Sequence, residues 1–171
     1  MDTFNAVQTV LAVRAFQEKS VPAEVKNRIL EAARLTGSGS NQQPWHFILV
    51  EGRAELKQLG ALVRSGPYVA QADFAVVVVI EKSQMALSDG SRAIQSMILA
   101  AWDDGVGSNW TGFVPMPEVN KLLNIPDNLD VLAILPFGYP VKQVGQGKKK
   151  RKAPAEVFYS GKFGQPYTPK W

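Results

Sequence analysis

Residues 74–80 read Phe-Ala-Val-Val-Val-Val-Ile, the longest unbroken apolar run in this chain of 171 residues. Consecutive β-branched residues favour a strand, and an apolar run without alternation favours a strand that is covered on both faces. Shorter apolar runs at 47–50 and 131–135 predict two more strands. Strands buried on both faces need helices on either side of the sheet, so the expected fold class is α+β.

Helical periodicity occupies much of the remaining sequence. Apolar residues recur at helical spacing from Phe4 to Leu11, which predicts a first helix that ends near Phe16. A second helix is expected to have Pro22 in its first turn and to end at Gly37, because proline suits a first turn and glycine a helix end. Three further helices are predicted within residues 53–64, 88–104 and 118–123. Residues 1–171 are expected to form one domain, with helices on both faces of a sheet.

The residue types that are missing exclude several kinds of chemistry. The chain has no cysteine and one histidine, His46, which rules out a disulfide framework, a thiolate nucleophile, an iron–sulfur cluster and a multi-histidine metal site. It contains no Gly-x-Ser-x-Gly motif and no phosphate-binding GxGxxG or Walker loop. We therefore predict no metal and no catalytic side chain, so an enzyme of this composition would take its chemistry from a cofactor.

The apolar runs are also short for a membrane protein. The run at 74–80 falls far below the roughly 20 residues that span a bilayer. Residues 1–5 lack the basic segment and the apolar stretch of a secretory signal. A soluble, cytoplasmic protein without a membrane partner is expected.

The positive charge is concentrated at one end of the sequence. The net charge is +4, but residues 1–141 carry a balance of −3 and residues 142–171 a balance of +7. Five adjacent cations stand at Lys148–Lys152. From the residues alone this cluster is either a solvated charge run or a site for an anion such as a phosphate.

Two segments are candidate ligand-binding loops. Residues 38–44 contain no aliphatic side chain and lead through Trp45 into the strand at 47–50. Residues 105–113 read Gly-Val-Gly-Ser-Asn-Trp-Thr-Gly-Phe, and their glycines permit positive φ and the close approach of a flat or anionic ligand. A helix cap followed by a turn fits the second segment equally well.

The order of these segments resembles the FMN-dependent nitroreductase family over nearly the whole chain. Family members have an Arg-x-Ser-x-(Lys/Arg)-x-Phe segment and a Pro-Ser-x-x-Asn-x-Gln-Pro-Trp loop, which are similar to residues 10–16 and 37–45. Their helix ending in Gly-Leu-Gly-x-x-Trp, their Gly-Tyr-Pro and their basic tail are similar to residues 100–110, 138–140 and 151–154. Matches in the same order make the resemblance specific.

This resemblance implies a nitroreductase-like α/β/α sandwich with a mostly antiparallel central sheet, assembled as an intertwined homodimer that binds FMN at its interface. It also implies an NAD(P)H oxidoreductase that reduces a nitroaromatic, a quinone or a similar acceptor by a ping-pong mechanism. The cofactor-binding residues implied by position are Arg14, Ser38, Gly39, Ser40, Asn41, Gln43, Thr111, Gly112, Lys149 and Arg151.

Each implied contact has a physical role. Arg14 would stabilise the charge that develops at flavin N1 and the C2 carbonyl. Ser38, Gly39 and Ser40 would contact the isoalloxazine ring or ribityl chain from the partner subunit, while Asn41 and Gln43 would fix the loop or touch the cofactor. The backbone at Thr111–Gly112 would donate a hydrogen bond to flavin N5. Residues 142–171 would form a basic extension that contributes to the phosphate site and to the dimer.

The sequence departs from the family near its start. Val10 and Ala12 stand where the family usually has Arg and Ser, so neither can contact the phosphate or the pyrimidine edge of the flavin. The phosphate would then fall to Lys148–Lys152, with Lys149 and Arg151 as the predicted ligands. Two alternatives stay open: a family member that uses a deazaflavin or a dedicated substrate, and a non-catalytic protein that binds a polyanion through the cluster. Nucleic acid is disfavoured because no aromatic residues are interleaved with the cations.

Overall fold

The sheet at the centre of the molecule has four strands in the order β1-β2-β4-β3, and all neighbours are antiparallel. The computed structural model describes residues 1–64, 66–112, 115–142 and 149–170. The strands are β1 (Trp45–Glu51), β2 (Phe74–Glu81), β3 (Gly107–Ser108) and β4 (Leu129–Gly138). The strands predicted around residues 47–50, 74–80 and 131–135 are confirmed.

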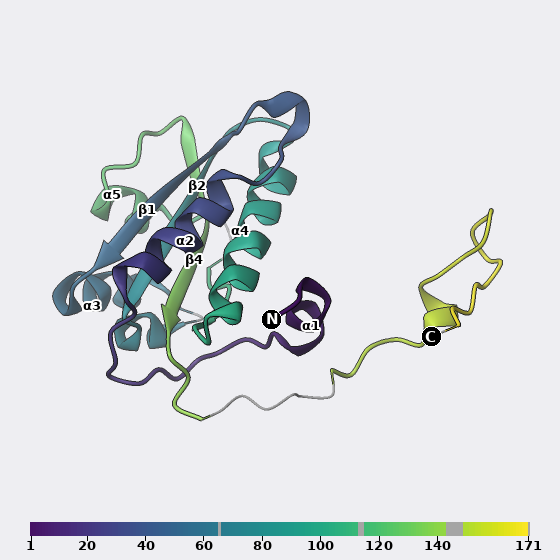
Figure 1. Cartoon of the computed structure of the whole chain (residues 1–171). Helices are drawn as coiled ribbons and strands as arrows, with labels where there is room; N and C mark the ends of the chain where they lie inside the picture. Colours follow the sequence, from purple (N-terminus) through teal and green to yellow (C-terminus); the bar gives the residue numbers. More distant parts are fainter. Residues whose placement is uncertain (65, 113–114, 143–148, 171) are drawn as a thin grey trace.

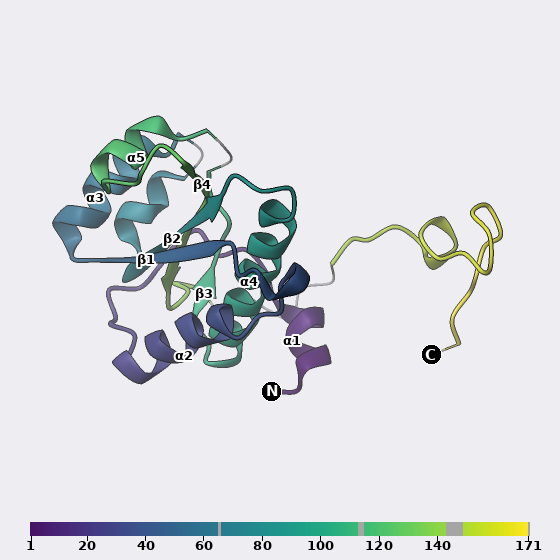
Figure 2. The same cartoon turned by 90° about the horizontal axis from the view of Figure 1, so that it is seen from above.

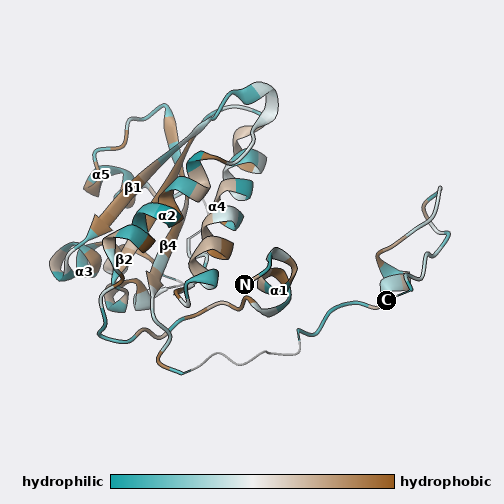
Figure 3. Cartoon of the chain, viewed as in Figure 1, coloured by the Kyte–Doolittle hydropathy of each residue, from teal (hydrophilic) through white to brown (hydrophobic). Residues whose placement is uncertain are grey.

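Strand β2 is buried on both faces, as its sequence predicted. Phe74, Val76, Val78 and Ile80 belong to one apolar cluster, and Ala75, Val77 and Val79 belong to another. Successive side chains of a strand point to opposite faces, so one run of apolar residues supplies two cores. Each large side chain buried in this way contributes about 1.5–3 kcal/mol. Figure 3 shows the hydrophobic strands enclosed between helices with hydrophilic outer faces.

Helices cover both faces of the sheet (Figures 1 and 2). Helices α2 (Ala23–Arg34) and α4 (Ala86–Asp103) pack on the first cluster through Ile29, Ile94 and Met97. Helices α3 (Arg53–Leu62) and α5 (Pro117–Leu122) pack on the second, together with the 3-10 turn Pro67–Gln71. The fold is therefore the α/β/α sandwich that was expected. None of the described helices is long and apolar enough to cross a membrane.

The predicted first helix is wrong at its C-terminal end. Helix α1 covers only Thr3–Thr9, and the residues after it are extended. Ala12 bridges to Ser108 of β3, and the Val13 N–H donates to the Ser108 carbonyl at 2.9 Å. Val13 is 2% exposed because Gly107 leaves room for its side chain. Pairing with the edge of β3 therefore stabilises an extended backbone here in place of a helix.

Residues 149–170, termed the C-terminal arm, lie away from the sandwich (yellow in Figures 1 and 2). The arm contains a short 3-10 turn (Pro154–Glu156) and a bridge between Tyr159 and Pro166. Its apolar side chains face outward, and Phe163 is 90% exposed. A hydrogen bond from Lys149 Nζ to the Val7 carbonyl, at 2.6 Å, joins its start to α1.

Candidate functional site

Residues 38–43, termed the left-handed loop, have an unusual backbone. The backbone φ values of Ser40, Asn41 and Gln43 are 48°, 55° and 53°. These values lie in the left-handed region, which residues other than glycine rarely adopt. Each such residue costs roughly 1–2 kcal/mol and persists only where the surroundings enforce it. All three side chains are exposed, so the loop presents amide and hydroxyl groups to its surroundings.

Local hydrogen bonds hold the left-handed loop in this shape. Ser38 Oγ accepts from the Gln43 N–H at 2.9 Å, which closes the loop on itself. The Gly39 N–H donates at 3.0 Å to Asp89 of α4, whose carboxylate is fully buried. At the far end Trp45 enters β1 and is buried in the core. The structure thus brings Ser38, Ser40, Asn41 and Gln43 into one exposed loop, with Gly39 at its anchored start.

The second candidate segment, Thr111–Gly112, follows β3. Thr111 is 2% exposed and exchanges two backbone hydrogen bonds of 2.9 Å with Ile134. The Thr111 N–H is therefore engaged within the sheet, and a bond from this segment to a flavin would have to come from Gly112. Gly112 has a φ of 73°, and its carbonyl accepts from Trp110 Nε1 at 3.1 Å.

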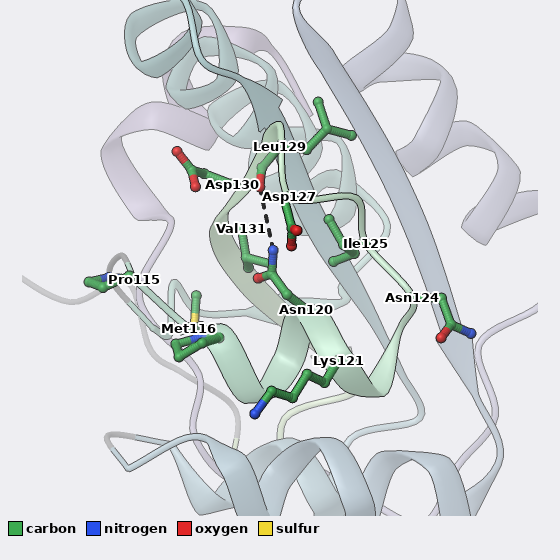
Figure 4. Close-up of a pocket in the computed structure, with 11 residues that line it drawn as sticks. Pro115, Met116, Asn120, Lys121, Asn124, Ile125, Asp127, Leu129, Asp130 and Val131 are labelled. Atoms are coloured by element: carbon green, nitrogen blue, oxygen red, sulfur yellow. Dashed lines mark hydrogen bonds between the residues drawn. The ribbon is translucent and has the colours of Figure 1, made fainter.

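A cation that was not predicted from the sequence lies beside Gly112. Arg64, just after α3, lines a cavity of about 250 Å³ together with Gly112, Met116 and Glu118. No motif marks Arg64, because its place depends on how α3 packs against the start of α5. A larger cavity, of about 510 Å³, lies between α5 and the start of β4 and contains none of the predicted site residues. Both polar and apolar side chains line this larger cavity (Figure 4). Asn120 Nδ2 donates to the Leu129 carbonyl at its wall.

The other predicted cations stand on separate parts of the chain. Arg14 is exposed on the extended segment beside β3, and no ion pair of the described residues includes it. Lys149 rests on the Val7 carbonyl, and burial together with the neighbouring Arg151 lowers the pKa of its ammonium group. Arg151 is exposed and donates to the Lys150 carbonyl at 3.0 Å. Lys148 lies outside the described residues.

These positions do not meet within a single copy of the chain. No hydrogen bond or ion pair of the described residues joins Arg14, Lys149 or Arg151 to the left-handed loop. The loop contacts the first turn of α4 through the hydrogen bond between Gly39 and Asp89, whereas Lys149 contacts Val7 of α1. The structure therefore separates groups that one bound cofactor would have to contact together.

Comparison with known proteins places the chain in a family. The model of the nitroreductase family matches residues 11–92 and 81–139. A Methanothermobacter thermautotrophicus protein, provisionally named NADH dehydrogenase/NAD(P)H nitroreductase, is 32% identical over 154 residues, which cover 85% of this chain and 81% of that protein. The iodotyrosine deiodinase of Thermotoga neapolitana is 28% identical over 156 residues, 75% of this chain and 83% of its own length.

A solved structure of a nitroreductase has the same fold. The chain superimposes on a nitroreductase of Clostridium difficile R20291, described as FMN-dependent, with a TM-score of 0.83, 22% identity, and coverage of 94% of this chain and 99% of that one. The chain belongs to the nitroreductase family. Membership supports an oxidoreductase with the nitroreductase fold.

Proposed function

We propose that the chain is an FMN-dependent NAD(P)H oxidoreductase that reduces a nitroaromatic, a quinone or a similar acceptor by a ping-pong mechanism. The left-handed loop is the observation that carries this proposal. It holds three residues in a strained backbone with their side chains outward, at the place where the family resemblance implies flavin contacts. The FMN-dependent relative from Clostridium supports the same cofactor.

The residues present offer charges and hydrogen-bond donors that suit FMN. Gly112 has a φ of 73°, which favours glycine, and its lack of a Cβ leaves room for Met116, since a Cβ there would lie 2.6 Å from Met116 Sδ. Arg14 is an exposed cation on the segment beside β3, Arg64 is an exposed cation beside Gly112, and the donors of the left-handed loop suit carbonyl and hydroxyl groups. When bound, FMN would accept a hydride from NAD(P)H and pass electrons to the acceptor.

The protein's own contribution would be electrostatic and positional. Arg14 would favour negative charge at the pyrimidine edge of the flavin, and Gly112 N–H would donate to N5. Ser38, Ser40, Asn41 and Gln43 would orient the ring or the ribityl chain, with Gly39 admitting close approach. No side chain is proposed as a covalent catalyst, and electrons pass through one shared site.

The phosphate would be held by Lys149 and Arg151. Val10 and Ala12 offer no charged or hydrogen-bonding side chain at the start of the chain, and the arm is the densest source of cations. Among the described residues, Lys149 Nζ donates to a neutral acceptor, the Val7 carbonyl. A phosphate offers a stronger, charge-assisted bond, so the contact to Val7 is one that a ligand would displace.

We further propose that the protein is a homodimer, with the C-terminal arm packed on the partner. Phe163 is 90% exposed, and Phe4 of α1 is 65% exposed. Removing apolar side chains from water lowers the free energy, and these two remain largely exposed to water among the described residues of one copy. A dimer would also bring a left-handed loop, an Arg14 and an arm from two copies to one cofactor. The cytoplasmic location stays a prediction.

Titration with FMN, followed by the quenching of flavin fluorescence, tests the cofactor. Saturable binding at micromolar concentration, with oxidation of NADH or NADPH by the loaded protein, is the expected result. Binding of a deazaflavin in place of FMN would correct the cofactor. Binding of duplex DNA with a steep salt dependence, in the absence of flavin binding, would favour the polyanion alternative.

A further inference from the structure

A buried carboxylate lies against the left-handed loop and has no part in the proposed chemistry. Asp89, in the first turn of α4, is 0% exposed. One oxygen, Oδ2, accepts from the Gly39 N–H at 3.0 Å, and the other pairs with the Arg92 guanidinium at 3.3 Å. A buried charge is costly unless it is paired and hydrogen-bonded, and the N-terminal turn of a helix also favours an anion. Asp89 meets these conditions by contacting the loop.

Close packing brings α4 to the loop. A Cβ on Gly90 would lie 2.8 Å from Leu132 Cδ2, so the helix sits directly on the sheet at this turn. The loop and the residue before it reach the start of the helix at ordinary contact distance: a Cβ on Gly37 would lie 3.4 Å from Arg92 Nη2, and one on Gly39 would lie 3.4 Å from Met85 Cε. The first turns of α4 therefore form the surface on which the loop begins.

We infer that Asp89 is a positioning residue that fixes the left-handed loop for flavin binding by holding the Gly39 amide. The loop is then held at both ends, by Asp89 at its start and by buried Trp45 beyond its end. Between these ends the Ser38–Gln43 bond closes the strained turn. Without the hydrogen bond to Asp89 the left-handed residues relax to backbone conformations of lower energy. Flavin binding then has to reorder them, which weakens the affinity.

This inference rests on the proposed function, and the anchor itself can be measured without a cofactor. Hydrogen exchange of the cofactor-free protein reports the protection of the Gly39–Gln43 amides. Asp89→Ala should accelerate their exchange while the β2 amides stay protected. Asp89→Asn retains an oxygen that accepts from Gly39, so it should restore most of the protection.

Flavin binding tests the consequence for function. Asp89→Ala should weaken FMN and riboflavin alike by at least about tenfold, which corresponds to a binding-competent loop in about a tenth of the molecules. Asp89→Asn should stay within about threefold of the unsubstituted chain on the same population scale. Equal losses for both flavins set this effect apart from loss of a phosphate contact, which would weaken FMN alone.

A second pair of variants addresses the donor rather than the acceptor. Gly39→Pro removes the N–H that Asp89 accepts, and Ser38 already has the extended backbone that a following proline requires (φ −128°, ψ 161°). Gly39→Ala is the matched control, because it keeps the N–H and adds a Cβ at ordinary contact distance. In the cofactor-free protein, Gly39→Pro should accelerate exchange of the following loop amides as Asp89→Ala does, even if Asp89→Ala itself does not fold. Gly39→Ala should keep the exchange rates of the unsubstituted chain, since its Cβ would lie 3.4 Å from Met85 Cε.

The outcomes separate the two claims. Unchanged loop exchange and unchanged flavin affinity in both Asp89→Ala and Gly39→Pro would overturn the role of Asp89 and leave the flavin proposal standing. A failure of the unsubstituted protein to bind either flavin would overturn the proposed function, and this inference with it. Loop exchange accelerated in Gly39→Ala as much as in Gly39→Pro would show that space at position 39, and not the hydrogen bond to Asp89, controls the loop, and would overturn the inference.

Discussion

Replacing Lys149 and Arg151 together by alanine should weaken FMN binding and leave riboflavin binding nearly unchanged. A hydrogen bond to a charged group contributes about 1.5–3 kcal/mol, and the two residues would supply two such bonds. Lys149 first has to leave the Val7 carbonyl, a neutral contact of about 1 kcal/mol. The net loss at the low end is roughly 2 kcal/mol, which raises the Kd for FMN about 30-fold.

Fluorescence titration with both flavins measures this difference directly. Riboflavin lacks the phosphate, so it reports damage to the rest of the site. The matched control is Lys142→Ala with Lys162→Ala, which removes the same charge from two exposed positions of the same basic region. If FMN affinity survives the loss of Lys149 and Arg151, or falls equally in the control, the phosphate site has been placed wrongly.

Three further predictions follow from single contacts. Because burial and Arg151 lower the pKa of Lys149, this group loses its proton below the usual 10.5, and FMN affinity measured against pH should fall in that alkaline range while riboflavin affinity does not. Gly107→Ala would place a Cβ 2.7 Å from Val13 Cβ, and Val13 is β-branched and cannot easily move away. A denaturant titration should therefore show a loss of about 1–3 kcal/mol in the free energy of unfolding. The control is Gly164→Ala, whose Cβ would have nothing within 4 Å and should cost only the strain of a positive φ. Phe163→Asp should shift light scattering from a dimer toward a monomer; a dimer mass at all concentrations would remove Phe163 from the proposed interface.

The layers of the fold could be predicted because local sequence dictates them. The short, β-branched run at 74–80 predicts a strand covered on both faces, and Pro22 marks the start of α2, which ends at Arg34, three residues before Gly37. Residues 10–16 could not be read in this way. Their spacing suits a helix, and the competing partner is the edge of β3, almost a hundred residues further along the chain.

The candidate site could also be predicted only in part from the sequence. The loop at 38–43 is recognisable by composition, but its left-handed backbone is not, since Ser and Gln rarely adopt positive φ and Asn, although it does so more often, is a weak signal alone. Its anchor joins Gly39 to Asp89, fifty residues apart, and Arg64 reaches Gly112 only through the packing of α3 and α5. Contacts of this kind depend on tertiary structure and leave no local pattern.

Anaerobic titration of the FMN-loaded protein with NADH or NADPH, followed by addition of a quinone or nitroaromatic, shows whether the chain carries electrons from a nicotinamide to an acceptor through FMN. We predict that the protein binds FMN saturably, that the nicotinamide bleaches the visible band of the oxidised flavin, and that the acceptor restores it. A protein that binds no FMN at tens of micromolar, or whose bound FMN stays oxidised with both nicotinamides, would contradict the assignment as an FMN-dependent NAD(P)H oxidoreductase.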